Sequence, residues 1–429
     1  MIKRHLFLTP AMLTFIMFSI IGCLSGTETD STSDKPVQST IDVSSDKPAP
    51  SPIVESSEPG DNSTAPPPDA TPEYIVIGGK RISTEETELH LLINIEEIEG
   101  EIVYHVCTTM EKADAEISQL SYMTNLQVLS IDYYSCPGFN SKFNDISILA
   151  GLTNLTSLSL TGHSISDIDA LSGLINLRSL DLKWNEISDI SALAGLFNLE
   201  FLELEGNEIS DISALAGLTK VSNLNLSRNR IADINVLAEL KNLRVLRLFD
   251  VHDEIKDANG FIGTISELTD LNVLVIGGHH IDDIGALANL VNLTELRMWN
   301  CQISDISALA GLNCLTKLDI RDSDISDISV LADLVNLSEF WMWNCQINDI
   351  TPIAELTSLS DLWLSNNQIS DLSPLAGLAN LTYLHLDSNQ IKDLEPLARL
   401  TNMRNLSLSY NQISDWSPVE HIDTVLGRP

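Results

Sequence analysis

The sequence is poor in basic and aromatic residues. Only 24 of its 429 residues are Lys or Arg, against 60 Asp and Glu, and aromatic residues make up 5%. The net charge of -36 excludes a nucleic-acid backbone as a partner, because phosphate binding requires clustered Lys and Arg. Hydrophobic residues nevertheless reach 44%, so we expect an aliphatic core.

Motifs for catalysis and metal binding are also missing. The sequence contains no phosphate-binding glycine loop, no G-x-S-x-G and no H-E-x-x-H segment. His279 and His280 form the one histidine pair, but three zinc ligands do not converge there. His105 and Cys107 lack a third group that would orient a nucleophile. We therefore expect a protein that is not an enzyme and uses no cofactor or metal.

The first 22 residues predict an export signal. Lys3 and Arg4 precede a mostly apolar run from Leu6 to Ile21, which ends in the segment IIGC. A positive start followed by a short apolar segment is typical of a signal peptide, and IIGC resembles a bacterial lipobox. This resemblance implies that Cys23 is lipidated, which predicts a membrane-anchored lipoprotein on a bacterial cell surface. An ordinary signal peptide, and therefore secretion, is the alternative.

Residues 23–73 predict a tether. The segment consists mainly of Ser, Thr, Pro, Asp and Glu, and SDKP occurs in it twice. Such a composition cannot bury enough apolar surface to offset the entropy of ordering. We expect an extended, disordered linker between the membrane and a folded domain.

From residue 126 to residue 422 the chain repeats every 22 residues. Residues 177–198 read LRSLDLKWNEISDISALAGLFN, and residues 199–220 read LEFLELEGNEISDISALAGLTK. The template is L-x-x-L-x-L-x-x-N-x-I-x-D-I-x-x-L-x-x-L-x-N. Thirteen copies begin at Leu126, Leu155, Leu177, Leu199, Val221, Leu243, Leu271, Leu293, Leu315, Leu337, Leu359, Leu381 and Met403. A fixed period of this length indicates a solenoid.

Each copy predicts one coil with a strand on one side. The L-x-L alternation gives a short strand with its leucines inward. After the Asn, apolar residues recur every three positions, which suits a 3₁₀-like turn. Stacked coils bury a continuous aliphatic column. The predicted fold class is an α/β solenoid, a curved parallel β-sheet with 3₁₀ helices and loops on its convex side.

The 22-residue template with N-x-I-x-D-I resembles the leucine-rich repeats of bacterial internalins. The resemblance implies an exported, curved solenoid that binds proteins through its concave face. Internalins usually carry a helical N-terminal cap and an immunoglobulin-like domain, and neither is evident in this sequence. Host-cell invasion is therefore not carried over.

Two polar positions of the template have structural explanations. The ninth residue points inward, where a buried amide must be fully hydrogen-bonded. It is Asn185, Asn207, Asn229, Asn367, Asn389 or Asn411 in six coils, and His163, His279, Cys301, Ser323 or Cys345 in others. The thirteenth residue is Asp in most coils. We expect it to cap the convex helical turn rather than to bind calcium, which needs a dedicated ligand loop.

Residues 74–125 are predicted to be an N-terminal capping region, and residues 423–429 a C-terminal tail. YIVIGGKRIST predicts a hairpin around Gly78 and Gly79. Cys107 and Cys136 lie near this cap, and the sequence leaves open whether they form a disulfide. Cys314 replaces the last Asn of its copy and is predicted to be buried.

The copies from Leu126 and Leu243 are longer than the template. Both insertions follow the strand, so we expect them on the rim beside the concave face. Loops in such places often carry recognition, although drift at a tolerant site is the simpler explanation.

Positions three, five and seven of each strand face outward. At position seven, successive coils supply Trp299, Arg321 and Trp343, which predicts an arginine held between two indoles. Positions five and three supply Arg297, Asp319, Trp341, Trp363 and His385, and Glu295, Lys317, Glu339, Asp361 and Tyr383. We expect cross-strand ion pairs between Arg297 and Asp319 and between Glu295 and Lys317. Phe201, Arg247 and Phe249 extend this surface toward the N-terminus.

This concentration of aromatic and arginine side chains predicts a binding patch, because interface hot spots are rich in Trp, Tyr and Arg. The predicted ligand-binding residues are Arg297, Trp299, Arg321, Trp341, Trp343, Trp363, Tyr383 and His385. A partner protein is the expected ligand. Two alternatives remain open, a carbohydrate or cell-wall ligand stacked on the indole faces, and a structural spacer without a specific ligand.

Overall fold

The structure is a computed structural model that describes residues 72–77, 80–93, 104–106, 117–133, 144–251, 258–278 and 281–428. The predicted signal peptide, the lipidation residue Cys23 and the tether up to residue 71 lie outside these ranges, as do Cys107 and Cys136. Residues 67–429 form one compact unit. Among the described helices, none has the length and apolar character needed to span a bilayer.

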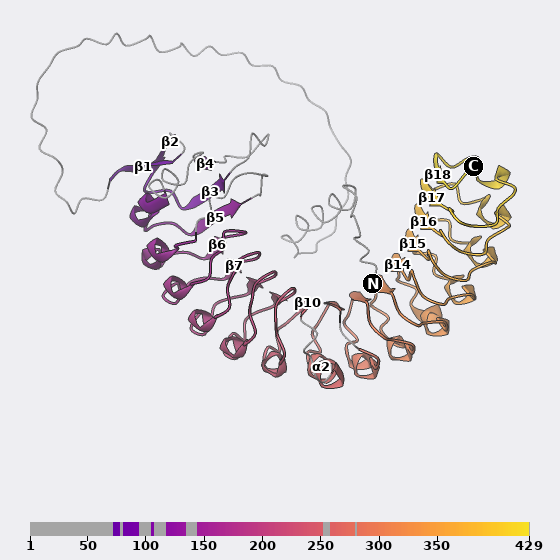
Figure 1. The fold of residues 1–429 in the computed structure, drawn as a ribbon, viewed down its shortest axis with the longest axis horizontal. Coiled ribbons are helices and arrows are strands. Elements are labelled where there is room, and N and C mark those ends of the chain that lie inside the picture. The colour runs from indigo at the N-terminus through magenta and orange to yellow at the C-terminus, as the bar shows by residue number, and fades with distance from the viewer. Residues whose placement is uncertain are drawn as a thin grey trace, which may run out of the picture. The chain divides into compact units, whose positions relative to one another are not determined.

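Sixteen of the described strands form one sheet, in which every neighbouring pair is parallel. Read from its C-terminal end, the sheet runs from β18 to β5 in reverse chain order and ends with β3 (Glu88–Ile93) and β4 (Tyr104–Val106). The strands of the coils are β5 (Val128–Tyr133), β6 (Ser157–Ser159), β7 (Ser179–Asp181), β8 (Phe201–Glu203), β9 (Asn223–Asn225), β10 (Val245–Phe249), β11 (Val273–Gly277), β12 (Glu295–Trp299), β13 (Lys317–Arg321), β14 (Glu339–Trp341), β15 (Asp361–Trp363), β16 (Tyr383–His385), β17 (Asn405–Ser407) and β18 (Thr424–Leu426). Figure 1 shows the coils stacked in sequence along an arc.

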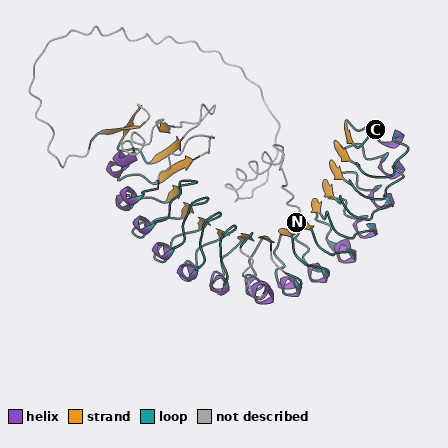
Figure 2. Ribbon diagram, viewed as in Figure 1, coloured by secondary structure: helices purple, strands orange, loops and turns teal. Residues whose placement is uncertain are grey.

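A short helix follows each of the strands β5 to β17 on the outer side of the arc, while the strands lie on its inner side (Figure 2). The 3₁₀ helices are η2 (Ser118–Tyr122), η3 (Ser147–Gly151), η4 (Asp169–Leu171), η5 (Ser191–Leu193), η6 (Ser213–Leu215), η7 (Asn235–Glu239), η8 (Gly285–Asn289), η9 (Ser307–Leu309), η10 (Ser329–Asp333), η11 (Thr351–Ile353), η12 (Ser373–Leu375), η13 (Glu395–Leu397) and η14 (Ser417–Val419). The predicted solenoid with a convex 3₁₀ side is thus confirmed.

The apolar positions of the template form one continuous core. In the coil that begins at Leu293, the side chains of Leu296, Met298, Ile303 and Leu309 are each 0% exposed. The strand of that coil alternates between partly buried and buried residues, as its L-x-M pattern requires. Because full burial of a Leu or Ile side chain stabilises a fold by about 1.5–3 kcal/mol, the column of leucines and isoleucines is the main source of stability.

The asparagines of position nine tie neighbouring coils together. Asn207 donates from Nδ2 to the carbonyl oxygens of Leu182 and Leu204, both at 3.0 Å, and its Oδ1 accepts from the amide of Ile187 at 3.1 Å. Asn185, Asn229, Asn367, Asn389 and Asn411 make equivalent bonds. The prediction of a satisfied inward amide is confirmed.

This asparagine ladder is interrupted in the middle of the solenoid. Position nine is Val251, Cys301, Ser323 and Cys345 in four of the coils between Asn229 and Asn367. Cys345 approaches the carbonyl of Ile320 only at 3.9 Å through its sulfur. Thiols and valine form weaker lateral hydrogen bonds than an amide or none, so these coils are joined mainly by their backbone and their apolar core.

The aspartates of position thirteen cap the convex helices, as predicted. Asp189 Oδ1 accepts a hydrogen bond from the amide of Ser191, the first residue of η5, at 2.8 Å. The same bond is made by Asp167, Asp211, Asp233, Asp283, Asp305, Asp327, Asp349, Asp371, Asp393 and Asp415. Acceptance of this amide bond lowers the pKa of Asp189. These carboxylates therefore have a structural role, which disfavours the calcium interpretation.

The N-terminal segment adds a hairpin and two more strands. Strands β1 (Tyr74–Ile77) and β2 (Lys80–Ser83) pair antiparallel with Ile77 opposite Lys80, so the predicted hairpin is confirmed. Strand β3 (Glu88–Ile93) lies beside β5, and β4 (Tyr104–Val106) lies on the outer side of β3. The sheet therefore extends beyond the first template copy.

Three features differ from the sequence-based expectations. The end of the insertion after β10 forms helix α2 (Ala258–Ile265), which packs with η7 and η8 on the convex side instead of lying on the rim. Three of its apolar side chains, Phe261, Ile262 and Ile265, are buried, which explains the placement. Residues 424–426, predicted to be part of a tail, form β18 on the edge of β17. Cys314 is exposed rather than buried, because its position lies in a surface turn.

Candidate functional site

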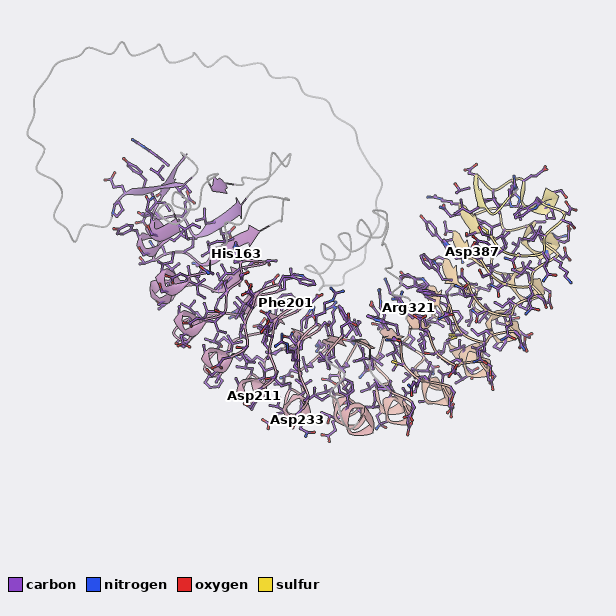
Figure 3. The ribbon with its side chains drawn as sticks, in the orientation of Figure 1. His163, Phe201, Asp211, Asp233, Arg321 and Asp387 are labelled. Carbon is purple, nitrogen blue, oxygen red and sulfur yellow. The ribbon has the colours of Figure 1, made fainter. Side chains whose placement is uncertain are left out.

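The inner face of the solenoid brings most of the predicted binding residues onto one sheet. Trp299, Arg321, Trp341, Trp343 and Trp363 are all partly buried and alternate with fully buried core residues. Figure 3 shows Arg321, Phe201 and Asp387 on the inner side of the arc, and Asp211 and Asp233 by the outer helices. The indole rings therefore lie on one shared surface and outside the core, as the sequence predicts.

Arg321 lies between two tryptophans. Its guanidinium is 5.2 Å from the ring centroid of Trp299 and 5.4 Å from that of Trp343. Cation–π contacts of this length stabilise a structure by about 0.5–2 kcal/mol each, depending on desolvation. The predicted sandwich is confirmed, and it fixes three large side chains in one geometry.

The buried carboxylate of Asp319 contacts the arginine of this sandwich. Asp319 is 2% exposed, and its Oδ2 lies 2.9 Å from Nη2 of Arg321. Neither carboxylate oxygen has a hydrogen bond of ordinary geometry, so the contact is an ion pair with poor alignment. Burial raises the pKa of Asp319 to about 6, against the lowering effect of Arg321 and Arg297. The pair therefore carries a desolvation cost that only the arginines offset.

The ion pairs around this centre differ from the predicted ones. The strand register does place Arg297 beside Asp319 and Glu295 beside Lys317. However, Arg297 pairs with Glu295 of its own strand at 2.7 Å. Lys317 instead pairs with Glu339 of the following strand at 2.8 Å. Asp319 pairs with Arg321 of its own strand instead of with Arg297.

A second row of rings follows position five. The guanidinium of Arg297 lies 5.3 Å from the ring centroid of Trp341, which is 5.5 Å from that of Trp363. Trp363 in turn stacks on His385 at 4.2 Å. We call this the position-five row. Burial lowers the pKa of His385, against the raising effect of Asp387, which favours the neutral imidazole.

Asp361 lies beside this row. Burial raises its pKa to about 6, and interactions with the indole N–H groups of Trp363 and Trp341 lower it. These contacts do not have ordinary hydrogen-bond geometry, because both Nε1 atoms and Oδ1 of Asp361 are buried without a partner in the described structure. The two indoles and the Asp361 carboxylate thus lie close together without being held by hydrogen bonds.

The row of rings that contains Trp299, Arg321 and Trp343 continues further toward the N-terminus than the sequence indicated. The ring of Phe249 lies 5.4 Å from Trp299, and the guanidinium of Arg228 lies 5.5 Å from Phe249 and 5.1 Å from Trp184. Together, Trp184, Arg228, Phe249, Trp299, Arg321 and Trp343 form what we call the aromatic–arginine ladder. It crosses the coils from Leu177 to Leu337.

Two glycines allow the ladder to skip a coil. A Cβ on Gly206 would lie 2.6 Å from Cε3 of Trp184, and one on Gly277 would lie 2.8 Å from Cε2 of Trp299. Each indole therefore lies flat on a glycine and reaches the coil beyond it. Both glycines therefore belong to the site, because a side chain at either position would displace the indole.

Sequence reasoning missed Trp184 and Arg228 because they occupy position eight, which reads as a turn. Both adopt a left-handed backbone, with φ of 60° and 56°. Asn, Asp or Gly tolerate this conformation at other copies, whereas a bulky residue there is strained. The available signal was the succession Trp184, Gly206, Arg228 at the same template position.

Comparison with known proteins agrees with this architecture. A family model described as leucine-rich repeat region matches residues 139–393, and one described as leucine-rich repeats in two copies matches residues 379–421. The crystal structure of the internalin InlF from Listeria monocytogenes is 31% identical, with 81% of this chain and 89% of that chain covered and a TM-score of 0.59. The chain is a leucine-rich repeat protein of the internalin type.

This leucine-rich repeat protein shares its fold with further bacterial structures. A leucine-rich repeat protein of Leptospira interrogans is 21% identical, with 71% of this chain and 85% of that chain covered and a TM-score of 0.56. The functional domain of InlJ from Listeria monocytogenes is 19% identical, with 65% and 64% covered and a TM-score of 0.53. At these identities the similarity concerns the fold alone. A search of curated proteins finds no match.

The leucine-rich repeat protein also has a polar groove of about 520 Å³ beside the interrupted asparagine ladder. Its lining includes Cys301, Ser323, Cys345, Asp322 and Asp324. Burial raises the pKa of the Cys345 thiol to about 11, so the sulfur is neither a nucleophile nor a thiolate ligand at pH 7. No group of three or more potential metal ligands occurs in the part of the chain that the structure describes, and the His279–His280 pair lies outside it.

Proposed function

We propose that this chain is a non-catalytic binding protein that recognises a partner protein on its concave face. The observation that supports this most directly is the continuity of the aromatic–arginine ladder over the inner face. Leucine-rich repeat solenoids present extended concave surfaces suited to binding. Trp and Arg provide large contact areas with few rotatable bonds, which is why they dominate interface hot spots.

Preorganisation strengthens the argument. Trp299 and Trp343 are held by Arg321, and Trp341 is held by Arg297 and Trp363. Side chains that are already ordered lose little entropy when a partner binds. The same contacts also stiffen the sheet, so a purely structural role predicts that their removal changes stability and nothing else.

The predicted N-terminus completes the proposal. A signal peptide over residues 1–22, an acyl group on Cys23 and a linker over residues 23–73 would hold the solenoid at a bacterial membrane surface. Cys23→Ser should then abolish incorporation of an alkyne-labelled fatty acid and release the chain from the membrane fraction. Undiminished labelling in that variant would contradict lipidation of Cys23, and secretion would remain as the alternative.

The binding function can be tested by capture from bacterial or host cell surfaces with the full chain. Trp341→Ala combined with Trp343→Ala should reduce recovery of the captured protein by at least tenfold, while the melting temperature falls only slightly. Phe197→Ala is the matched control, because Phe197 is an aromatic residue 58% exposed in the turn after η5. Equal recovery with all three proteins would contradict the proposal, and capture of glycan alone would select the carbohydrate alternative.

A further inference from the structure

The polar groove beside the interrupted asparagine ladder has the size of a small-molecule site. Its volume of about 520 Å³ lies within the range of about 300–1,000 Å³ that is typical of ligand pockets. Apart from Gly278, its lining comes from the turns that follow strands β12, β13 and β14, at positions eight, nine and ten of three consecutive coils. We call it the turn groove.

The two walls of the turn groove have the same order of side chains. Each presents an amide, a carboxylate and a second amide in consecutive coils. Position eight supplies Asn300, Asp322 and Asn344, and position ten supplies Gln302, Asp324 and Gln346. Between the walls lie the buried position-nine residues Cys301, Ser323 and Cys345. The groove is therefore a polar channel that crosses three coils.

The carboxylate in each wall is oriented by an amide of the following coil. Asn344 donates from Nδ2 to Oδ1 of Asp322 at 2.6 Å, and Gln346 donates from Nε2 to Oδ1 of Asp324 at 3.0 Å. No ion pair involves either aspartate among the described residues. Burial raises the pKa of the Cys345 thiol, and both carboxylates add to this effect. Two negative charges thus lie at the groove without a cation, which disfavours an anionic ligand.

The lining suits a ligand that carries many hydroxyl groups. An amide both donates and accepts hydrogen bonds, whereas a carboxylate only accepts them. A hydroxyl donates and accepts, so a row of hydroxyls can satisfy both kinds of wall residue. None of the described residues that line the groove is Lys, Arg or aromatic.

The spacing of the wall residues points to a chain of sugar units. Equivalent residues of neighbouring coils repeat at the strand spacing of about 4.8 Å, which is close to the length of one pyranose unit in a linear glycan. An ammonium group would also pair with Asp322 or Asp324, but it would fill only a small part of the volume and leave most of the amides unused.

We propose that the turn groove binds a neutral oligosaccharide, whose successive sugar units form hydrogen bonds through their hydroxyls to the amides and carboxylates of the two walls. This inference goes beyond the proposed function, because no residue of the aromatic–arginine ladder or of the position-five row lines the groove. For the same reason it differs from a sugar stacked on the indole faces.

Soluble sugars test the inference directly. The probes are cellohexaose, maltohexaose, mannohexaose and chitohexaose, each titrated into the full chain by isothermal calorimetry, with a hyaluronan hexasaccharide as the anionic comparison. At least one neutral probe should bind, and hyaluronan should bind more weakly because of the two carboxylates.

Substitutions in the walls locate the bound sugar. Asn344→Gly removes a wall amide and suits the left-handed backbone at this residue, where φ is 59°, and Gln346→Ala removes an amide of the opposite wall. Each should weaken binding about fivefold, the loss of one hydrogen-bonding group. Asn366→Gly and Gln390→Ala make the same changes at the same template positions outside the groove lining, and both should bind like the wild type.

The possible outcomes separate this inference from its rivals. Equal binding by all four variants, or no binding of any neutral probe by the wild type, would overturn it. Binding of a hexa-lysine peptide that Asp322→Asn abolishes, without any sugar binding, would assign the groove to a cation instead. If no sugar binds but a protein is captured through Trp341 and Trp343, the inference fails and the proposed function stands. If sugar binding depends on Asn344 and no protein is captured, the proposed function fails and the inference stands.

Discussion

The guanidinium of Arg228 lies 5.1 Å from the ring centroid of Trp184, although a whole coil separates the two residues in the stack. The intervening coil contributes Gly206 at this place, and the indole lies flat against it. The contact is possible only because that residue has no side chain. It is the N-terminal end of a row of rings and guanidinium groups that reaches Trp343.

Gly206→Ala should disrupt this end of the ladder. Its φ is +70°, and the new Cβ would lie 2.6 Å from the Trp184 ring, so strain and displacement of the indole should lower the free energy of unfolding by about 1–3 kcal/mol. Gly195→Ala is the control, since nothing lies within 4 Å of a Cβ there. Urea denaturation measures both, and equal stability of the two variants would argue against the packing described.

Replacing Arg321 alone should lower the free energy of unfolding more than replacing Arg321 and Asp319 together. Arg321→Met keeps the stem but leaves Asp319 2% exposed without its close partner, which should cost about 3 kcal/mol. Adding Asp319→Asn should recover most of that loss, because no buried charge remains. Chemical denaturation of the single and double variants gives the comparison, and a double variant no more stable than Arg321→Met would show that the buried charge is not the cause.

The contribution of Glu203 to the free energy of unfolding should decrease as the pH rises. Burial raises the pKa of Glu203 from 4.5 to about 7, so between these values the folded chain binds more protons than the unfolded chain. This contribution is complete below pH 4.5 and is lost as the pH rises through 7. Glu203→Gln should therefore be more stable than the wild type at pH 8 by about 1–3 kcal/mol, with no such advantage at pH 4.5. Glu200→Gln, an exposed neighbour, should show no comparable pH-dependent gain in urea unfolding.

Asn207→Ala tests the asparagine ladder. The substitution removes two donated bonds and one accepted bond and leaves buried backbone groups without partners, which should cost about 2–4 kcal/mol. Asn198→Ala removes an exposed amide that donates to the carbonyl of Ile175 at 2.9 Å and accepts from Nζ of Lys220 at 2.8 Å, and because both bonds are exposed to water its cost should stay near about 1 kcal/mol. Thermal and urea unfolding compare the two. Similar losses would mean that burial does not set the value of these amides.

Much of the fold follows from the sequence because the period fixes it. A residue such as Leu296 or Ile303 must face the core in every coil, so register, strand position and convex helices follow from one template. The aspartate caps and the Arg321 sandwich are consequences of the same register. These features need only the spacing between copies and the sidedness of a strand.

The remaining features depend on depth and reach, which spacing does not specify. Arg297 pairs with Glu295 of its own strand, and the buried Asp319 pairs with Arg321, although the register alone places Arg297 beside Asp319. Trp184 belongs to the ladder only because a glycine lies beneath its ring, a fact that appears when neighbouring coils are compared at position eight. The tail segment Thr424–Leu426 became a strand because β17 otherwise exposes an unpaired edge.

The interruption of the asparagine ladder has a mechanical consequence. At position nine, Asn229 and Asn367 each make two side-chain hydrogen bonds to the preceding coil, whereas Cys345 contacts the preceding coil from this position through its sulfur, at 3.9 Å from the carbonyl oxygen of Ile320. When the two ends are pulled apart, we expect the middle span around Cys345 to yield first and the flanks to survive as intact blocks. If one end of the chain were anchored and a bound partner exerted force on it, the middle coils would separate first. The concave face of the coils on either side would stay folded.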